Sequence, residues 1–207
     1  MEWEKLLCGE RVRAYARKGS GRDLRSEFEK DYHRIIGSAS FRRLQDKTQV
    51  FPLDTSDFVR TRLTHSLEVS SIARSLGRNV SEKIIEEIKD PEFDPSYTAD
   101  VCDILQCSGL IHDIGNPPFG HFGETTIREW FSKNLPDLTF EGKPVIDLFK
   151  DEMKNDFYHF EGNAQAFRLV TKLHFLVDNH GMNLTKGLLA TIIKYPVSST
   201  GIDKNSH

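Results

Sequence analysis

Residues 109–124, GLIHDIGNPPFGHFGE, constrain this chain more than any other stretch. They hold a His-Asp pair, a second histidine and a glutamate among four glycines and two prolines. His112 and Asp113 end an apolar helical pattern, where a buried ionised aspartate is costly unless something pairs with it. A divalent cation would pair with both side chains, and imidazole with carboxylate suits Zn, Mn, Fe, Co or Mg. The alternative is a buried His-Asp hydrogen bond without a metal.

The composition is that of a globular chain with much polar surface. The 207 residues are enough for one sizeable core, and the net charge of -3 gives no overall attraction to nucleic acid or membranes. Residues 11–47 are locally basic, which suits either a phosphorylated ligand or solvated helix faces. The three cysteines have no metal-ligand spacing, and we expect no signal peptide and no membrane span. A cytoplasmic location is the simplest expectation.

Apolar spacing predicts a mainly helical protein with few strands. We expect an arm over residues 1–24 with one short helix. Ser26, followed three residues later by Glu29, resembles a capping box at the start of the next helix. Helices are expected over residues 26–46, from 61 toward 88, and over 96–114, 124–135, 157–178 and 184–194, the last with Thr185 as its N-cap. Residues 48–60 and 136–147 are expected to be loops, the second with a small hairpin that turns at residues 141–142.

A third histidine shares an apolar helix face. His65, Val69, Ile72 and Leu76 recur at helical spacing, so His65 is expected to point inward with them. A lone histidine on such a face is more often a core residue than a ligand. Together with His112 and Asp113, however, it would leave open positions on a metal for water and substrate, which is the catalytic arrangement.

His121 and Glu124 are three residues apart around the start of a helix, where their side chains can meet. A carboxylate bonded to one imidazole nitrogen fixes the tautomer and leaves the other nitrogen free for proton transfer. The alternative is a surface histidine beside an N-terminal helix glutamate.

Four segments together match a known pattern: residues 42–53, 60–69, 112–124 and 160–165. They closely resemble the HD-domain deoxynucleoside triphosphate triphosphohydrolases, the deoxyguanosinetriphosphate triphosphohydrolase-like family. The resemblance covers about residues 25–196, and residues 112–124 are its most specific part. It implies an all-α HD-domain helical bundle with long loops over residues 25–207, after the arm of residues 1–24.

The resemblance also implies a ligand set and a reaction. The divalent metal would be held by His65, His112 and Asp113, with a further aspartate expected beyond His207. Family members are longer, so we expect the N-terminal part of such an enzyme and leave open whether it is active alone. The implied reaction hydrolyses a dNTP, with dGTP the expected substrate, to deoxynucleoside and inorganic triphosphate. A homo-oligomer is the expected assembly.

These residues suit water attack on the α-phosphorus. A bound metal can lower the pKa of water toward about 7 and polarise the phosphoryl oxygen. The leaving 5′ alkoxide is basic, and a general acid contributes about 10²–10⁴-fold. His121, oriented by Glu124, suits either donating to the 5′ oxygen or positioning the attacking water.

The triphosphate needs fixed cations around it. Arg62 lies three residues before His65, nearly one helical turn, so it can reach phosphate bound at the metal. By resemblance, Lys194 and Tyr195 correspond to a phosphate-contacting pair, and Gln49 corresponds to a glutamine near the deoxyribose.

Several residues and two rival functions stay open. No role is derived for Glu161 and Asn163, where packing is at least as good an explanation, and Arg42 and Arg43 suit a salt-bridge network as well as a nucleotide or subunit contact. One rival function is another HD-type nucleotide phosphohydrolase. The other is a non-catalytic HD module that oligomerises or binds single-stranded nucleic acid.

Overall fold

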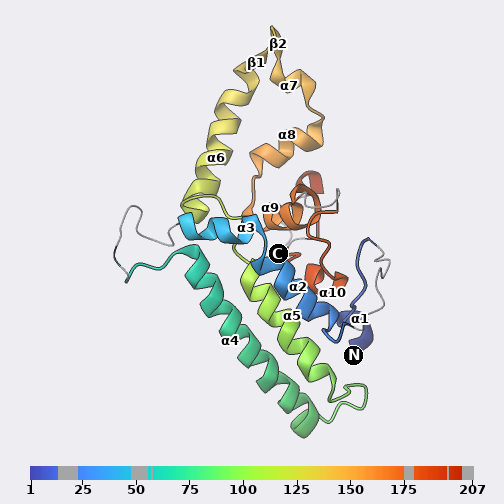
Figure 1. Cartoon of the computed structure of the whole chain (residues 1–207). Helices are drawn as coiled ribbons and strands as arrows, with labels where there is room; N and C mark the ends of the chain where they lie inside the picture. Colours follow the sequence, from blue (N-terminus) through green and yellow to red (C-terminus); the bar gives the residue numbers. More distant parts are fainter. Residues whose placement is uncertain (14–22, 48–55, 57, 175–179, 195, 202–207) are drawn as a thin grey trace.

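The computed structural model describes residues 1–13, 23–47, 56, 58–174, 180–194 and 196–201, and these are mostly helical (Figure 1). The described N-terminal arm holds a single short helix, α1 (Trp3–Leu6), as expected. No helix of the described part is both long and apolar enough to cross a membrane. Cys8, Cys102 and Cys107 are free thiols.

The helix expected over residues 26–46 is broken into three pieces. They are α2 (Glu27–Ile36), α3 (Ala39–Arg42) and the 3-10 turn η1 (Arg43–Asp46). The Ser26–Glu29 capping box is confirmed, since each side chain accepts from the other residue's amide. The prediction of one continuous helix is wrong because Gly37 ends α2 and Ser38 caps α3, its hydroxyl accepting from the Phe41 amide.

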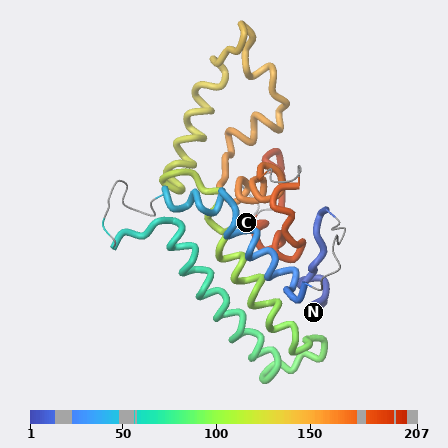
Figure 2. The backbone as a smooth tube through the Cα atoms, in the orientation of Figure 1, coloured from blue at the N-terminus to red at the C-terminus, as the bar shows by residue number. Residues whose placement is uncertain are grey.

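Two long helices form the body of the molecule and lie side by side (Figures 1 and 2). They are α4 (Arg62–Lys83), which continues into the π-helical turn η2 (Ile84–Ile88), and α5 (Tyr97–Ile111). Both were expected from the apolar spacing, and α5 ends three residues earlier than the predicted end at residue 114.

The side of α4 that packs on α5 is made of small residues, not of the expected apolar stripe. Its buried residues include Ser66, Ser70, Gly77 and Ser81. A Cβ on Gly109 of α5 would lie only 2.6 Å from the Ser70 Cα, so the two backbones nearly touch. The prediction that Ile72 and Leu76 point inward is therefore wrong: they are 61% and 55% exposed, because this close crossing admits only small side chains.

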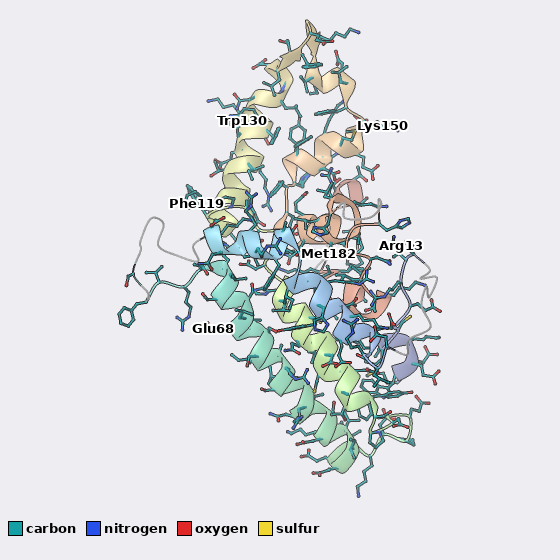
Figure 3. The ribbon with its side chains drawn as sticks, in the orientation of Figure 1. Arg13, Glu68, Phe119, Trp130, Lys150 and Met182 are labelled. Atoms are coloured by element: carbon teal, nitrogen blue, oxygen red, sulfur yellow. The ribbon has the colours of Figure 1, made fainter. Side chains whose placement is uncertain are left out.

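A second group of elements projects away from the body (Figure 2). It consists of α6 (Gly120–Asn134), η3 (Leu135–Asp137), α7 (Val145–Leu148) and α8 (Asp151–Tyr158), with a hairpin of β1 (Thr139–Phe140) and β2 (Lys143–Pro144) at its tip. The hairpin is confirmed, and both turn residues, Glu141 and Gly142, have positive φ as a tight turn requires. Trp130, on α6, is 48% exposed (Figure 3).

The helix expected over residues 157–178 is also interrupted. After α8 the chain leaves the helix at residues 159–161 and then forms α9 (Gly162–Arg168) and the π-helical turn η4 (Leu169–Leu173). Glu161 explains the new start, because its carboxylate caps α9 by accepting from the Ala164 amide at 2.9 Å. The last elements are α10 (Lys186–Thr191), capped by Thr185 as expected, and the 3-10 turn η5 (Ser199–Gly201).

The core lies where α2, α5, α9 and α10 meet. Its fully buried members include Ile35, Leu44, Leu110, Ile111 and Leu188. Burial of such side chains stabilises the fold by about 1.5–3 kcal/mol each. The predicted all-α class is confirmed for the described residues, whose strands are confined to the one small hairpin.

A buried arginine holds the N-terminal arm against this core. Arg11 Nη1 donates to Asp31 Oδ1 and to the Asn183 carbonyl, both at 2.6 Å. Arg11 Nε and Nη2 donate to the Glu27 carboxylate and carbonyl. The other Asp31 oxygen accepts from the Thr185 amide and hydroxyl at 2.9 and 2.7 Å. The arm is thus fastened to α2 and to the start of α10.

Candidate active site

The candidate site lies where four helix ends meet (Figure 1). α4 begins at Arg62, α5 ends just before His112, α6 begins at Gly120 and α9 begins at Gly162. Helix ends expose unpaired backbone groups, so polar side chains gather there at little cost.

The two expected histidine ligands face each other. The His65 and His112 rings are 5.3 Å apart between centroids and both are half-buried. His112 Nδ1 lies 2.8 Å from the Gly109 carbonyl oxygen. A carbonyl only accepts, so Nδ1 is the donor; in the neutral ring this leaves the lone pair on Nε2, which is the tautomer a metal ligand needs.

Asp113 is buried and tightly paired. Arg62 Nη1 lies 2.6 Å from both carboxylate oxygens, and each side chain is only 5% exposed. Asn116 Nδ2 donates to Asp113 Oδ1 as well. A buried Asp113 was expected to need a positively charged partner, and in the structure that partner is the guanidinium of Arg62.

The donor chemistry of His65, His112 and Asp113 fits a divalent ion, but the carboxylate is committed to Arg62. Across the described ranges, no three His, Cys, Asp or Glu side chains are grouped so as to hold a metal. Two imidazoles and one carboxylate are a normal set for a catalytic metal. The proposed ligands therefore suit a metal by type, and Arg62 occupies the place on Asp113 that a metal would take.

A strained bend connects the two halves of the site, which are His112 and Asp113 after α5 and His121 and Glu124 at the start of α6. Phe119 has φ of 67° and Gly120 of 55°, a left-handed pair that turns the chain into α6. Phe119 lies at the base of α6 and is 63% exposed (Figure 3). The bend brings the start of α6, with His121 and Glu124, back beside the end of α5.

His121 and Glu124 make the expected contact. His121 Nδ1 lies 2.8 Å from Glu124 Oε2, and Gly162 donates its amide to Oε1 at 2.7 Å. Burial raises the pKa of the Glu124 carboxyl, but hydrogen bonds from His121 and the Gly162 amide lower it by more, so the pKa lies below its ordinary value. The carboxylate is 5% exposed and the imidazole 90% exposed, so one partner is fixed and the other faces solvent.

Gly162 joins the two halves of the site. A Cβ at this position would overlap Asn116 Oδ1 and come within 2.8 Å of Glu124 Oε1. Gly115 is equally crowded, because a Cβ there would overlap the Ala166 amide of α9. Only glycine lets the backbone of α9 approach both the Asp113 side and the Glu124 side.

Some predicted substrate contacts are placed and others are not. Lys194 lies after α10 and is exposed, whereas Gln49 and Tyr195 fall outside the described residues. Arg62, expected to reach phosphate, is buried against Asp113 instead of projecting into solvent. Glu161 and Asn163 contact each other at 2.6 Å in the cap of α9, which supports the packing explanation for both.

Sequence reasoning assigned no role to three residues that build the site. Lys47 Nζ donates to the Asn116 carbonyl at 3.0 Å, and the Arg62 amide donates to the Lys47 carbonyl at 2.8 Å. Burial, with repulsion from Arg62, lowers the pKa of Lys47. Lys47, Asn116 and Gly162 all lie within the four matching segments, which was the available signal; their contacts span distances in sequence that no spacing pattern reveals.

Comparison with known proteins gives consistent results. An HD domain model matches residues 62–178. The chain is 55% identical over 205 residues to a deoxyguanosinetriphosphate triphosphohydrolase-like protein of Listeria monocytogenes, covering 99% of this chain and 44% of the relative. It is 46% identical to a protein of the same name from Pseudomonas aeruginosa, covering 96% and 42%. A deoxyguanosinetriphosphate triphosphohydrolase of Cronobacter sakazakii is 38% identical, covering 93% and 42%.

These relatives are longer proteins. The chain spans less than half of their length and corresponds to their N-terminal part. The HD match contains His65, His112, Asp113, His121 and Glu124. Because that match covers more than half of the sequence, the chain belongs to the HD domain family.

Proposed function

We propose that this chain carries the reaction centre of a metal-dependent dNTP triphosphohydrolase, which splits a dNTP into deoxynucleoside and inorganic triphosphate, with dGTP as the foremost substrate. The names of the relatives support a nucleotide triphosphohydrolase. HD domains are generally metal-dependent phosphohydrolases, which supports a divalent metal without fixing its identity. Since the chain spans under half of its relatives, the substrate and a homo-oligomeric assembly are proposed for the protein as a whole.

The observation that carries the proposal is the His121–Glu124 contact. Gly162 connects this contact to Asp113 and its partner Asn116. Glu124 is ionised and accepts from His121 Nδ1 at 2.8 Å, so His121 Nε2 is the nitrogen left for substrate. The ring is 90% exposed while its partner is held by the Gly162 amide. This arrangement suits a group that exchanges a proton with a 5′ oxygen or orients a water molecule.

The metal ligands are proposed from the chemical type of their side chains, two imidazoles and one carboxylate. A divalent ion held by His65, His112 and Asp113 would supply an acidified water and polarise the α-phosphoryl group. The Gly109 carbonyl orients His112 by accepting from Nδ1, so in the neutral ring Nε2 is the nitrogen that could bind a metal. The further aspartate expected beyond His207 would complete the set.

The triphosphate would be held by positively charged side chains. Arg62 is at the start of α4 and Lys47 lies beside it through the Arg62 amide. Lys194 follows α10. Arg62, Lys47 and Lys194 would neutralise the phosphate charge. By resemblance, Tyr195 would also contact phosphate and Gln49 the deoxyribose.

Turnover of dGTP by the full-length protein tests the proposal. The expected products are deoxyguanosine and inorganic triphosphate, and His121→Ala is expected to lower the rate by about 10²–10⁴-fold. His33→Ala, an exposed histidine on α2, is the matched control and should leave the rate unchanged. Wild-type turnover by His121→Ala would contradict the role of His121. Release of nucleoside monophosphate would favour another HD-type phosphohydrolase.

The non-catalytic alternative has weaker support. The locally basic residues 11–47 would be its nucleic-acid surface, but the Arg11 side chain is buried in ion pairs with Asp31 and Glu27. Arg42 donates to the Gly37 carbonyl at 2.7 Å, which is a local structural contact. A salt-dependent affinity for single-stranded oligonucleotides, combined with no turnover, would reverse this preference.

A further inference from the structure

The Arg62–Asp113 pair places a positive charge where the proposed metal would bind. A single nitrogen, Arg62 Nη1, lies 2.6 Å from both oxygens of the carboxylate. This is how a small cation sits on a carboxylate, not how a guanidinium usually forms two parallel hydrogen bonds. Both side chains are 5% exposed, so little water screens the contact.

The pair leaves other buried atoms without partners. Arg62 Nε is buried and makes no hydrogen bond, and Ser66 Oγ, one turn further along α4, is in the same state. An unpaired buried polar group costs about 1–3 kcal/mol. Arg62 is therefore paired through Nη1 with Asp113 while its Nε has no partner, so the buried guanidinium is incompletely satisfied.

A divalent cation cannot simply join this arrangement. Asp113 has both oxygens against Arg62, and Lys47 brings a second positive charge to the neighbouring Asn116 carbonyl at 3.0 Å. A third cation would meet repulsion from both while sharing one carboxylate. Sharing Asp113 would weaken the contact of each cation with the carboxylate, and Arg62 is the cation that lies on both of its oxygens.

We propose that Arg62 and a divalent metal compete for Asp113, so that metal binding releases the guanidinium toward the substrate phosphates. The proposal rests on the metal site of the proposed function and adds a coupling to it. Arg62 keeps the buried carboxylate neutralised when no metal is bound. Once displaced, it becomes a phosphate-binding group only in the metal-loaded state, which links metal occupancy to substrate binding.

Calorimetric titration of the full-length protein with Mn²⁺ tests this competition. Arg62→Gln removes the competing charge and is expected to bind Mn²⁺ roughly tenfold more tightly than wild type. Arg62→Lys keeps a cation that can sit on Asp113 and should stay near the wild-type affinity. Arg60→Gln, an exposed neighbour paired with Glu68, should leave the affinity unchanged.

Equal or weaker Mn²⁺ binding by Arg62→Gln, with wild type binding normally, would overturn the competition and leave the metal site intact. Absence of binding in every form would overturn the metal site itself, and with it the proposed function. Crystal structures of the wild type with and without Mn²⁺ give an independent check that does not require the variant to fold. Arg62 is expected to leave Asp113 when Mn²⁺ is present, and an unbroken ion pair beside bound Mn²⁺ would refute the proposal.

Discussion

Two arginine–aspartate ion pairs in the described part of the chain have both side chains buried, and they are satisfied very differently. In the Arg11–Asp31 pair, the guanidinium donates from all three nitrogens and each carboxylate oxygen has its own donor. In the Arg62–Asp113 pair, one nitrogen serves both oxygens and Arg62 Nε has no partner. The two pairs are equally buried, so exposure does not explain the difference.

This contrast indicates that the Arg11–Asp31 pair is a structural contact and that the Arg62–Asp113 pair belongs to a functional site. Arg11 is embedded in a network that ties the arm, α2 and α10 into one unit, and each contact supports the others. Arg62 lies at the start of α4, three residues before His65, and a Cβ on Gly120 at the start of α6 would meet its Nη2 at 3.0 Å. Incomplete satisfaction of buried polar groups is common where a ligand is to be received.

The largest effect should come from breaking the saturated pair. Arg11→Met leaves Asp31 buried and short of its cation, and we expect it to lower the free energy of unfolding by about 3–5 kcal/mol, measured by urea denaturation. Arg11→Met combined with Asp31→Asn should recover most of this loss. Arg62→Gln should cost less, because Arg62 donates through Nη1 alone to Asp113 and its Nε is already unpaired, whereas Arg11 donates from all three nitrogens. A larger loss for Arg62→Gln than for Arg11→Met would reverse the comparison.

Arg25→Met is the control for these substitutions. Arg25 pairs with Asp23 at 2.9 Å, but both side chains are about half exposed, so solvent screens the contact. No measurable change in the unfolding free energy is expected. A loss comparable to that of Arg11→Met would mean that burial is not what distinguishes these pairs.

A smaller effect is expected from adding one methyl group to the site. Gly162→Ala would press a Cβ against Asn116 Oδ1 and Glu124 Oε1, and overpacking of this kind costs about 1–3 kcal/mol. Gly9→Ala is matched to it, because its Cβ would meet Glu27 at an ordinary 3.6 Å. Thermal unfolding should show a loss for Gly162→Ala alone, and equal melting temperatures would show that α9 can retreat without cost.

The smallest effect should be in the acid response. The hydrogen bonds to Glu124 hold its pKa below the ordinary 4.5, so the stability it contributes is present above that pH and is lost as the pH falls through the folded value. Glu124→Gln cannot titrate and should lack this part of the acid loss. Unfolding free energies measured from neutral to acid pH should converge for wild type and Glu124→Gln at low pH. Parallel curves would mean that Glu124 is not stabilised as an anion.

The helical class and most helix positions could be predicted from the sequence, because caps and apolar spacing act locally. Ser26, Thr185 and the turn at Glu141 act within a few residues and were found. The inward side of α4 was assigned wrongly, because apolar spacing does not reveal that α5 approaches within the reach of Ser70. The breaks at Gly37 and Glu161 were missed because the apolar pattern continues across both.

In the candidate site, too, contacts between residues close in sequence could be predicted and contacts between distant residues could not. The His121–Glu124 contact is three residues long and was predicted from its spacing. The contacts of Lys47 with Asn116, of Gly162 with Glu124 and of Arg62 with Asp113 join residues 38 or more positions apart. Only the folded chain brings these groups together, so spacing along the sequence could not identify their partners.

The most direct test of the proposed reaction is to run dGTP hydrolysis by the full-length protein in ¹⁸O-labelled water and locate the label by mass spectrometry. Attack of water on the α-phosphorus, with His121 serving the 5′ oxygen, predicts the label in inorganic triphosphate and unlabelled deoxyguanosine. Label in deoxyguanosine, or formation of labelled monophosphate or pyrophosphate, would contradict it.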